Sequence, residues 1–186
     1  MLVFNFNPFP VIETERLILR KPVPEDIPAW FKMRSNEENM RYIGRKPATA
    51  IEEVKALYDL VVQDIEANKH IGWVVAEKSN ASGFVGMIGF HRIKPEHHRA
   101  EVGYMIEQEF QGKGYGKESV QAIINYAFDT MHIHSIEADI DKDNIASERL
   151  LLSIGFVKEG HFKESFYFEG TFIDSVIYSL LKSNIR

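Results

Sequence analysis

Apolar residues recur along this chain at two different periods, and each period predicts one kind of element. Residues three and four apart share one face of a helix, whereas alternate residues share one face of a strand. The helical period predicts helices over about 49–67 and 114–131, through Val54, Leu57, Tyr58, Val61, Val62 and Ile65 in the first and Val120, Ile123, Ile124, Ala127 and Phe128 in the second. The alternating period predicts a half-buried strand, in which Ile136, Ala138 and Ile140 alternate with Glu137, Asp139 and Asp141.

Shorter patterns and turn residues complete the expected order of elements. Further strands are expected at about 16–20, 71–77, 84–91, 99–106, 156–168 and 171–181, the last two joined at the hairpin signal Glu169-Gly170. One more helix is expected near Pro24, and another from Asn144 to just before Gly155. The polar segment 36–47 between helices is expected to form a wall over a site. The resulting order, β-α-α-β-β-β-α-β-α-β-β, predicts a mixed α/β single domain.

The composition is typical of one folded domain. Of the 186 residues, 45% are hydrophobic and 26% are charged, so we expect one domain over 1–186 with a real core. No Cys occurs, which excludes disulfides, thiolate metal sites and a Cys nucleophile. The net charge of −5 argues against general binding of nucleic acid. Because there is no apolar run of about 20 residues and no signal-peptide pattern, we expect a cytoplasmic protein with no membrane partner. We expect either a monomer or a homodimer.

A glycine-rich segment between an expected strand and an expected helix is the strongest functional signal. Such a turn directs backbone N–H groups and the positive end of the helix dipole at one point, and that point favours a phosphate. A nucleotide P-loop would need a glycine at position 111 and a hydroxyl at position 118, where the chain has Gln111 and Glu118. The dinucleotide fingerprint would need a third glycine at position 117, which is Lys117. The segment itself reads Gln111-Gly112-Lys113-Gly114-Tyr115-Gly116.

The pattern Gln-x-x-Gly-x-Gly fits this segment fully and resembles the coenzyme A pyrophosphate loop of the GNAT superfamily of N-acetyltransferases. A second motif, from Asn144 through Ser147 to Gly155-Phe156, resembles the second signature of that superfamily. The segments 14–20 and 99–104 resemble the RimJ/RimL-type branch, which acetylates the N-terminal residue of ribosomal proteins. The four motifs occur in the right order and cover about 14–182, which we take as the core of the domain.

The resemblance implies a fold, a cosubstrate and a set of binding residues. The fold would be a central, mostly antiparallel sheet of about seven strands with about four helices, in which the fourth and fifth strands splay apart. The activity would be transfer of an acetyl group from acetyl-CoA to a primary amine, with a protein N-terminus as the expected acceptor and no metal. Pantetheine would lie in the splay, against the backbone of Met105 and Ile106 and near Asn144 and Ser147. The pyrophosphate would be held by Gln111, Gly112, Lys113, Gly114, Tyr115, Gly116 and Lys117.

Acetyl transfer to an amine needs a group that accepts the proton of the ammonium. Glu101, on the strand that borders the splay, is the first candidate, although an ion pair with Arg92 or Arg99 would also explain an acid there. Asp139 on the facing strand is the alternative base. His91 and His134 could titrate near neutral pH, but surface or strand-end positions explain them better.

The departing thiolate needs a proton or a stabilising dipole, and here the chain departs from the family pattern. Many relatives carry Tyr seven residues after the motif Asn, whereas this chain has Leu151, which cannot donate a proton. Ser147, Tyr167, Tyr178 or solvent could serve instead, and Ser147 is the expected residue.

Two other functions compete with acetylation of a protein N-terminus. One is acetylation of a small amine, such as a polyamine or an aminoglycoside. Acids lining the acceptor pocket would favour a polycation, whereas an extended groove would favour a peptide. The other is a module that binds acyl-CoA without catalysis, which the missing Tyr would permit and which an intact loop together with Glu101 argues against.

Overall fold

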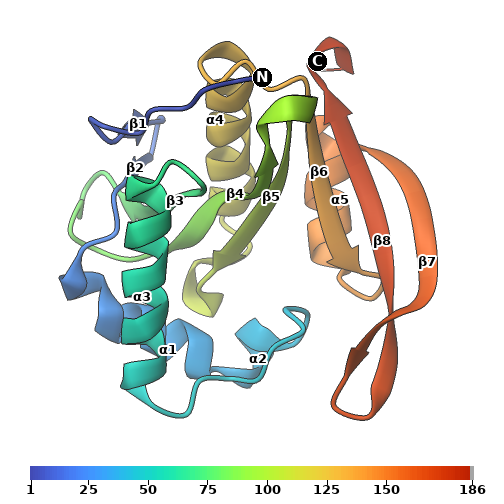
Figure 1. Cartoon of the computed structure of the whole chain (residues 1–186). Helices are drawn as coiled ribbons and strands as arrows, with labels where there is room; N and C mark the ends of the chain where they lie inside the picture. Colours follow the sequence, from blue (N-terminus) through green and yellow to red (C-terminus); the bar gives the residue numbers. More distant parts are fainter. Residues whose placement is uncertain (185–186) are drawn as a thin grey trace.

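The computed structural model describes residues 1–184, which form one open sheet with helices on both faces (Figure 1). The strands are β1 (Ile12–Glu13), β2 (Leu17–Arg20), β3 (Ile71–Glu77), β4 (Gly86–Lys94), β5 (Arg99–Ile106), β6 (Ser135–Asp141), β7 (Val157–Phe168) and β8 (Thr171–Leu181). The α-helices are α1 (Ile27–Ser35), α2 (Glu37–Met40), α3 (Ile51–Glu66), α4 (Tyr115–Asp129) and α5 (Ile145–Ile154). Within the described range, none of these helices combines the length and the apolarity that crossing a membrane requires.

The predicted mixed α/β fold with a mostly antiparallel sheet is confirmed. The strand order is β1-β2-β3-β4-β5-β6-β8-β7, and the only parallel neighbours among the described strands are β5 and β6. Two short elements were not expected. The two-residue strand β1 pairs with β2 at the edge of the sheet. Helix α2 lies inside the segment expected to be a wall, and the Asn36 side chain caps it by accepting hydrogen bonds from two backbone N–H groups.

The two faces of the sheet are covered by different helices. On one face, α1 and α3 pack through a small cluster that contains Trp30, Met33 and Val54 and reaches Met87 and Met105 on the sheet. On the other face, the apolar side of α4 and Leu151 of α5 join the main core around Trp73 and Phe90. Side chains alternate along a strand, so each strand contributes to both layers. In Figure 1, α3 lies in front of the sheet and α4 lies behind it.

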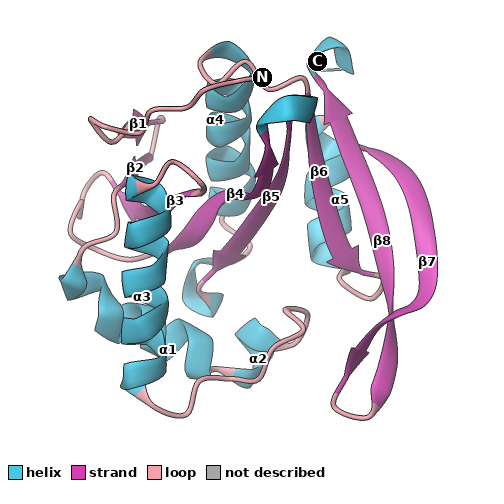
Figure 2. Ribbon diagram, viewed as in Figure 1, coloured by secondary structure: helices cyan, strands magenta, loops and turns pink. Residues whose placement is uncertain are grey.

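The sheet opens between β5 and β6, as predicted for the fourth and fifth expected strands. These two strands pair only over Arg99–Glu101 and Ser135–Glu137. Beyond this point β5 stays paired with β4 as far as Ile106, whereas β6 stays paired with β8 as far as Asp141. The ribbons of β5 and β6 therefore diverge (Figure 2).

Candidate active site

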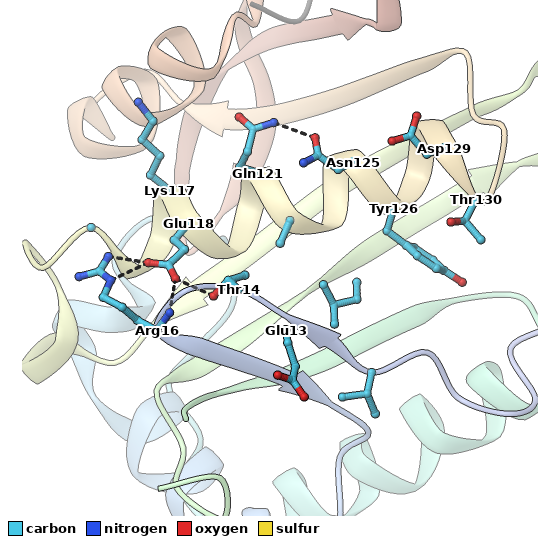
Figure 3. A pocket seen from close by; sticks show the side chains of 14 residues that line it. Glu13, Thr14, Arg16, Lys117, Glu118, Gln121, Asn125, Tyr126, Asp129 and Thr130 are labelled. Atoms are coloured by element: carbon cyan, nitrogen blue, oxygen red, sulfur yellow. Dashed lines mark hydrogen bonds and ion pairs between the residues drawn. The ribbon is translucent and has the colours of Figure 1, made fainter. Parts of the chain in front are cut away.

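A cleft of about 610 Å³ lies at the splay and is the candidate active site. Its walls come from β4, β5 and β6, from α1, α3 and α5, and from the loop after α2. A second hollow, of about 930 Å³, lies between β1 and α4 (Figure 3). We place the active site in the cleft because Glu101, Tyr104 and Ser147 all line it.

Strand β5 presents its candidate residues on opposite faces of the sheet. Glu101 and Met105 have odd numbers and lie on the face of α1 and α3, where Met105 packs in their cluster. Tyr104 has an even number and lies on the face of α4 and α5, where its hydroxyl meets Ser147. Because β6 is absent beside this part of β5, both faces open into the same cleft.

The Glu101 carboxylate lies at the point where the two strands separate. Its side chain is 17% exposed, and its Oε2 is 3.0 Å from the Arg92 guanidinium, so the ion pair considered from the sequence does form. Burial raises the pKa of Glu101, the Arg92 charge lowers it in part, and the carboxylates of Glu137 and Asp139 raise it further. Partial removal from water also raises the pKa of Asp139, which lines the same cleft.

A pair of hydroxyl groups faces the cleft from the opposite layer. The hydroxyl of Tyr104 lies 2.6 Å from that of Ser147, and either can donate. Burial raises the pKa of Tyr104 to about 12, so its hydroxyl keeps its proton at neutral pH. The side chain of Asn144 accepts a hydrogen bond from the Ser147 backbone N–H and thereby starts α5. Sequence reasoning missed Tyr104, although its alternation with Glu101 along β5 pointed to the other wall of the same cleft.

The other expected donors to the thiolate lie elsewhere. Leu151 is fully buried in the main core. Tyr178 is 1% exposed and donates to Glu148 at 2.6 Å, while Tyr167 is 62% exposed on the β7–β8 hairpin. Neither tyrosine lines the cleft, so Ser147 is the member of the expected set that does.

Two histidines form a neutral patch beside Glu101. The rings of His70 and His91 stack at 4.9 Å between centroids and lie over Gly72 and Gly103, where a Cβ atom would come within 2.8 Å and 2.6 Å of them. His91 lines the cleft and is exposed there. Desolvation lowers the pKa of each ring to about 4, so both are uncharged at neutral pH.

The open edge of β5 offers backbone groups to a ligand. Glu107 donates its N–H to Val85 of the neighbouring segment, so the backbone groups of Tyr104 and Ile106 point the other way, toward the splay. By the same alternation the backbone of Met105 points at β4, while its side chain lines the cleft. The side chain of Gln111 already donates to the Ile106 carbonyl at 2.8 Å. The Ile106 N–H is therefore the backbone group of this residue that can donate to a ligand in the splay.

The glycine-rich loop has the geometry of an anion site at the start of a helix. Gly112 and Gly114 adopt φ values of +73° and +82°, which favour glycine. The first helical hydrogen bond of α4 runs from the Glu118 N–H to the Gly114 carbonyl, so the preceding N–H groups have no partner within the helix. These orphan donors and the exposed side chains of Lys113 and Lys117 fit the charge of a pyrophosphate.

A network around Arg16 ties this loop to the turn between β1 and β2 (Figure 3). The Arg16 guanidinium binds Glu118 at 2.6 Å, donates to the Lys113 carbonyl at 2.9 Å and lies over the Tyr115 ring at 4.6 Å. Thr14 adds a hydrogen bond of 2.6 Å to Glu118. Glu118, the residue that argued against a P-loop, thus helps to fix the loop. Sequence reasoning had no signal for this contact, because its partners lie 102 residues apart.

Comparison with known families agrees with this geometry. The model of the acetyltransferase (GNAT) domain family matches residues 16–157. The chain belongs to the GNAT family of acetyltransferases. Its architecture and splayed cleft are those of a GNAT N-acetyltransferase, an enzyme that transfers acetyl groups to amines.

Individual relatives cover almost the whole chain. The uncharacterized N-acetyltransferase YoaA of Bacillus subtilis (strain 168) is 36% identical to this chain, and the match covers 94% of this chain and 98% of YoaA. The crystal structure of spermidine N-acetyltransferase from Vibrio cholerae, in complex with CoA and spermine, superposes with a TM-score of 0.82 at 26% identity, over 92% of this chain and 98% of that one. The ribosomal L7/L12 α-N-protein acetyltransferase RimL in complex with coenzyme A also has a TM-score of 0.82, over 92% and 98% of the two chains, but at 21% identity this similarity shows the fold alone.

Proposed function

We propose that this GNAT enzyme transfers the acetyl group of acetyl-CoA to the N-terminal α-amine of a peptide or protein. The relatives leave this choice open, because the Vibrio cholerae relative acts on spermidine whereas RimL acts on a ribosomal protein. The choice therefore depends on the walls of this chain's own cleft.

The observation that carries the proposal is the balance of charge around the cleft. Its lining contains the acids Asp64, Glu101 and Asp139 and an equal number of arginines, Arg34, Arg45 and Arg92. A polyamine carries several positive charges and would be bound by an excess of acids. A peptide N-terminus has one ammonium group, which the acids beside the splay can bind. The rest of the peptide requires no excess of positive or negative charge in the cleft.

The residues present fit acetyl-CoA on the other side of the splay. In this proposal the backbone of Tyr104 binds the pantetheine arm as an added strand would, and Asn144, Ser147 and the side chain of Met105 border it. The loop from Gln111 to Gly116, with Lys117, binds the pyrophosphate, the anion to which its orphan N–H groups are suited.

The chemistry then divides between the two faces of β5. Glu101 accepts the proton that the ammonium must lose, directly or through water, and the amine attacks the thioester carbonyl. The Ile106 N–H donates to the oxyanion that develops. As the carbon–sulfur bond breaks, the Ser147 hydroxyl, itself paired with Tyr104, supplies a proton to the departing thiolate. The second proton, which the attacking nitrogen loses as the amide forms, restores the Ser147 hydroxyl directly or through water. No covalent enzyme intermediate is needed.

A turnover panel tests this function. Purified protein is incubated with acetyl-CoA and with unstructured peptides, the same peptides blocked at the N-terminus, spermidine, and an aminoglycoside, and release of free CoA is measured. We expect turnover with the free peptides, and acetylation of their α-amine by mass spectrometry. Turnover of spermidine alone would instead support the small-amine function, and binding of CoA without any turnover would support a non-catalytic module.

A further inference from the structure

The cleft lining contains two arginines that form no ion pair with a carboxylate of the described chain. Arg34 lies in the last turn of α1 and Arg45 lies in the loop after α2, and both line the cleft. The third arginine of the lining, Arg92, is already paired with Glu101. Within residues 1–184, the neighbouring cations Arg41 and Lys46 form ion pairs, with Glu38 and Glu169, but Arg34 and Arg45 form none.

The position of Arg45 is fixed by the residues on both sides of it. Gly44 has a φ of +65° and lies so close to the hairpin that a Cβ atom would come within 2.8 Å of the Phe166 ring. Lys46 binds Glu169 of the same hairpin at 2.7 Å. The backbone of the loop is also tied to α1, because the Ala48 N–H donates to the Arg34 carbonyl at 2.9 Å. The loop therefore holds Arg45 in the cleft wall next to the end of α1.

The two guanidinium groups repel each other at this place. Burial lowers the pKa of Arg34, which is half-buried, and the charge of Arg45 lowers it further. The charge of Glu53 raises the pKa of Arg34 and so opposes this repulsion. The Glu53 carboxylate, however, accepts a hydrogen bond of 2.7 Å from Thr49, just before α3. Asp64 and Asp139 also line the cleft but pair with neither arginine in the described chain. A carboxylate bound between the two arginines would relieve this repulsion.

We propose that Arg34 and Arg45 form a subsite for a carboxylate carried by the acceptor, and that the enzyme prefers N-terminal amines followed within a few residues by Asp or Glu. This inference rests on the proposed function and names its substrate class. The planar guanidinium binds a carboxylate through two parallel hydrogen bonds, and carboxylates are the anions that ordinary peptides carry. A polyamine has no such group and would be repelled by these two guanidinium groups.

Matched peptides and matched variants test the subsite. Peptide pairs would differ only by Asp or Asn at the second or third position, and kcat/KM would be measured for each with the wild type, Arg34→Gln, Arg45→Gln and the double variant. Since partly exposed charge pairs contribute modestly, we expect the wild type to prefer the Asp peptide by about three- to tenfold. The preference should vanish in the double variant while turnover of the Asn peptide persists.

Arg41→Gln is the control, because Arg41 lies in the same segment, pairs with Glu38 and does not line the cleft. It should keep the preference of the wild type. Arg45→Glu should reverse the preference, toward a peptide with Lys at that position. If Arg34→Gln fails to fold, Arg45→Gln and Arg45→Glu still test the subsite, because Arg45 is exposed.

Equal use of the Asp and Asn peptides by the wild type, or a preference that survives in the double variant, would overturn the subsite while leaving N-terminal acetylation intact. Failure of the wild type to acetylate any peptide, with spermidine acetylated in the same assay, would overturn the proposed function, and the subsite with it.

Discussion

At the scale of single residues, the environment of Glu101 sets the pH at which the proposed reaction can occur. A general base must be deprotonated, so turnover is lost as the pH falls through its pKa. Burial raises this pKa above that of an exposed Glu, and the Arg92 charge limits the rise. The acid limb of the pH–rate profile should therefore lie above the range of an ordinary carboxylate.

Replacing Glu101 with Gln should lower turnover roughly 10²–10⁴-fold, because the variant keeps the size of the side chain and loses only its ability to accept a proton. Binding of acetyl-CoA, measured by calorimetry, should change little. Asp139→Asn is the matched comparison. If that variant lost turnover and Glu101→Gln did not, the base would be Asp139.

Replacing Arg92 with Gln removes the charge that lowers the pKa of Glu101. The pKa of Glu101 should then rise, and the acid limb of kcat/KM should move to higher pH while the plateau stays close to that of the wild type. An unmoved limb would show that a different group limits the rate at low pH.

The leaving group can be tested at Ser147 and Tyr104. A thiol has a pKa near 8.5 and leaves without strong assistance, so we expect Ser147→Ala to lower kcat by only about ten- to a hundredfold, with a smaller change in acetyl-CoA affinity. Tyr104→Phe should have a similar but smaller effect if Tyr104 acts through Ser147. A drop confined to affinity, with kcat intact, would mean that Ser147 only holds the cosubstrate.

At the scale of elements, the start of α4 depends on Arg16, which lies in the turn between β1 and β2. Arg16→Gln removes the contacts with Glu118, the Lys113 carbonyl and the Tyr115 ring together, and should weaken CoA binding roughly three- to tenfold, since partly exposed pairs contribute modestly. Lys78→Gln is the control, because Lys78 pairs with Glu13 nearby but does not reach the loop. Equal affinities of both variants would show that the loop keeps its shape without Arg16.

The same scale shows which parts of the fold the sequence could predict. Long elements such as α3 and α4 carry several turns of helical period, and the hairpin carries a turn signal, so both were found. Strand β1 and helix α2 have two and four residues, too few to show any period. The sequence could propose the loop and Ser147 because local motifs carry them, and Glu101 because it lies on the bordering strand; the structure places Glu101 and Ser147 in the cleft lining, and their roles stay predictions. The Arg16–Glu118 and Tyr104–Ser147 contacts were missed because they join residues that only the fold brings together.

At the scale of the whole molecule, the N-terminal half and the C-terminal hairpin meet at the loop after α2, part of which lines the cleft. The contact of Gly44 with Phe166 and the Lys46–Glu169 ion pair join them. Phe166→Ala should loosen the loop and raise the KM for the acceptor severalfold, with little change in CoA affinity. Phe172→Ala is the control, because Phe172 is exposed on the same hairpin but packs on Tyr167. Equal effects of the two variants would assign the change to the hairpin rather than to the loop.

The placement of Glu101 and Ser147 on opposite faces of the sheet also bears on whether both substrates can be bound at the same time. Two substrates that reach one reaction centre from opposite sides do not compete for space, so donor and acceptor can occupy the protein together. Initial velocities measured at several fixed acceptor concentrations should then give intersecting rather than parallel double-reciprocal lines. Free CoA should compete with acetyl-CoA but not with the acceptor, because the two substrates would bind on opposite sides of the reaction centre.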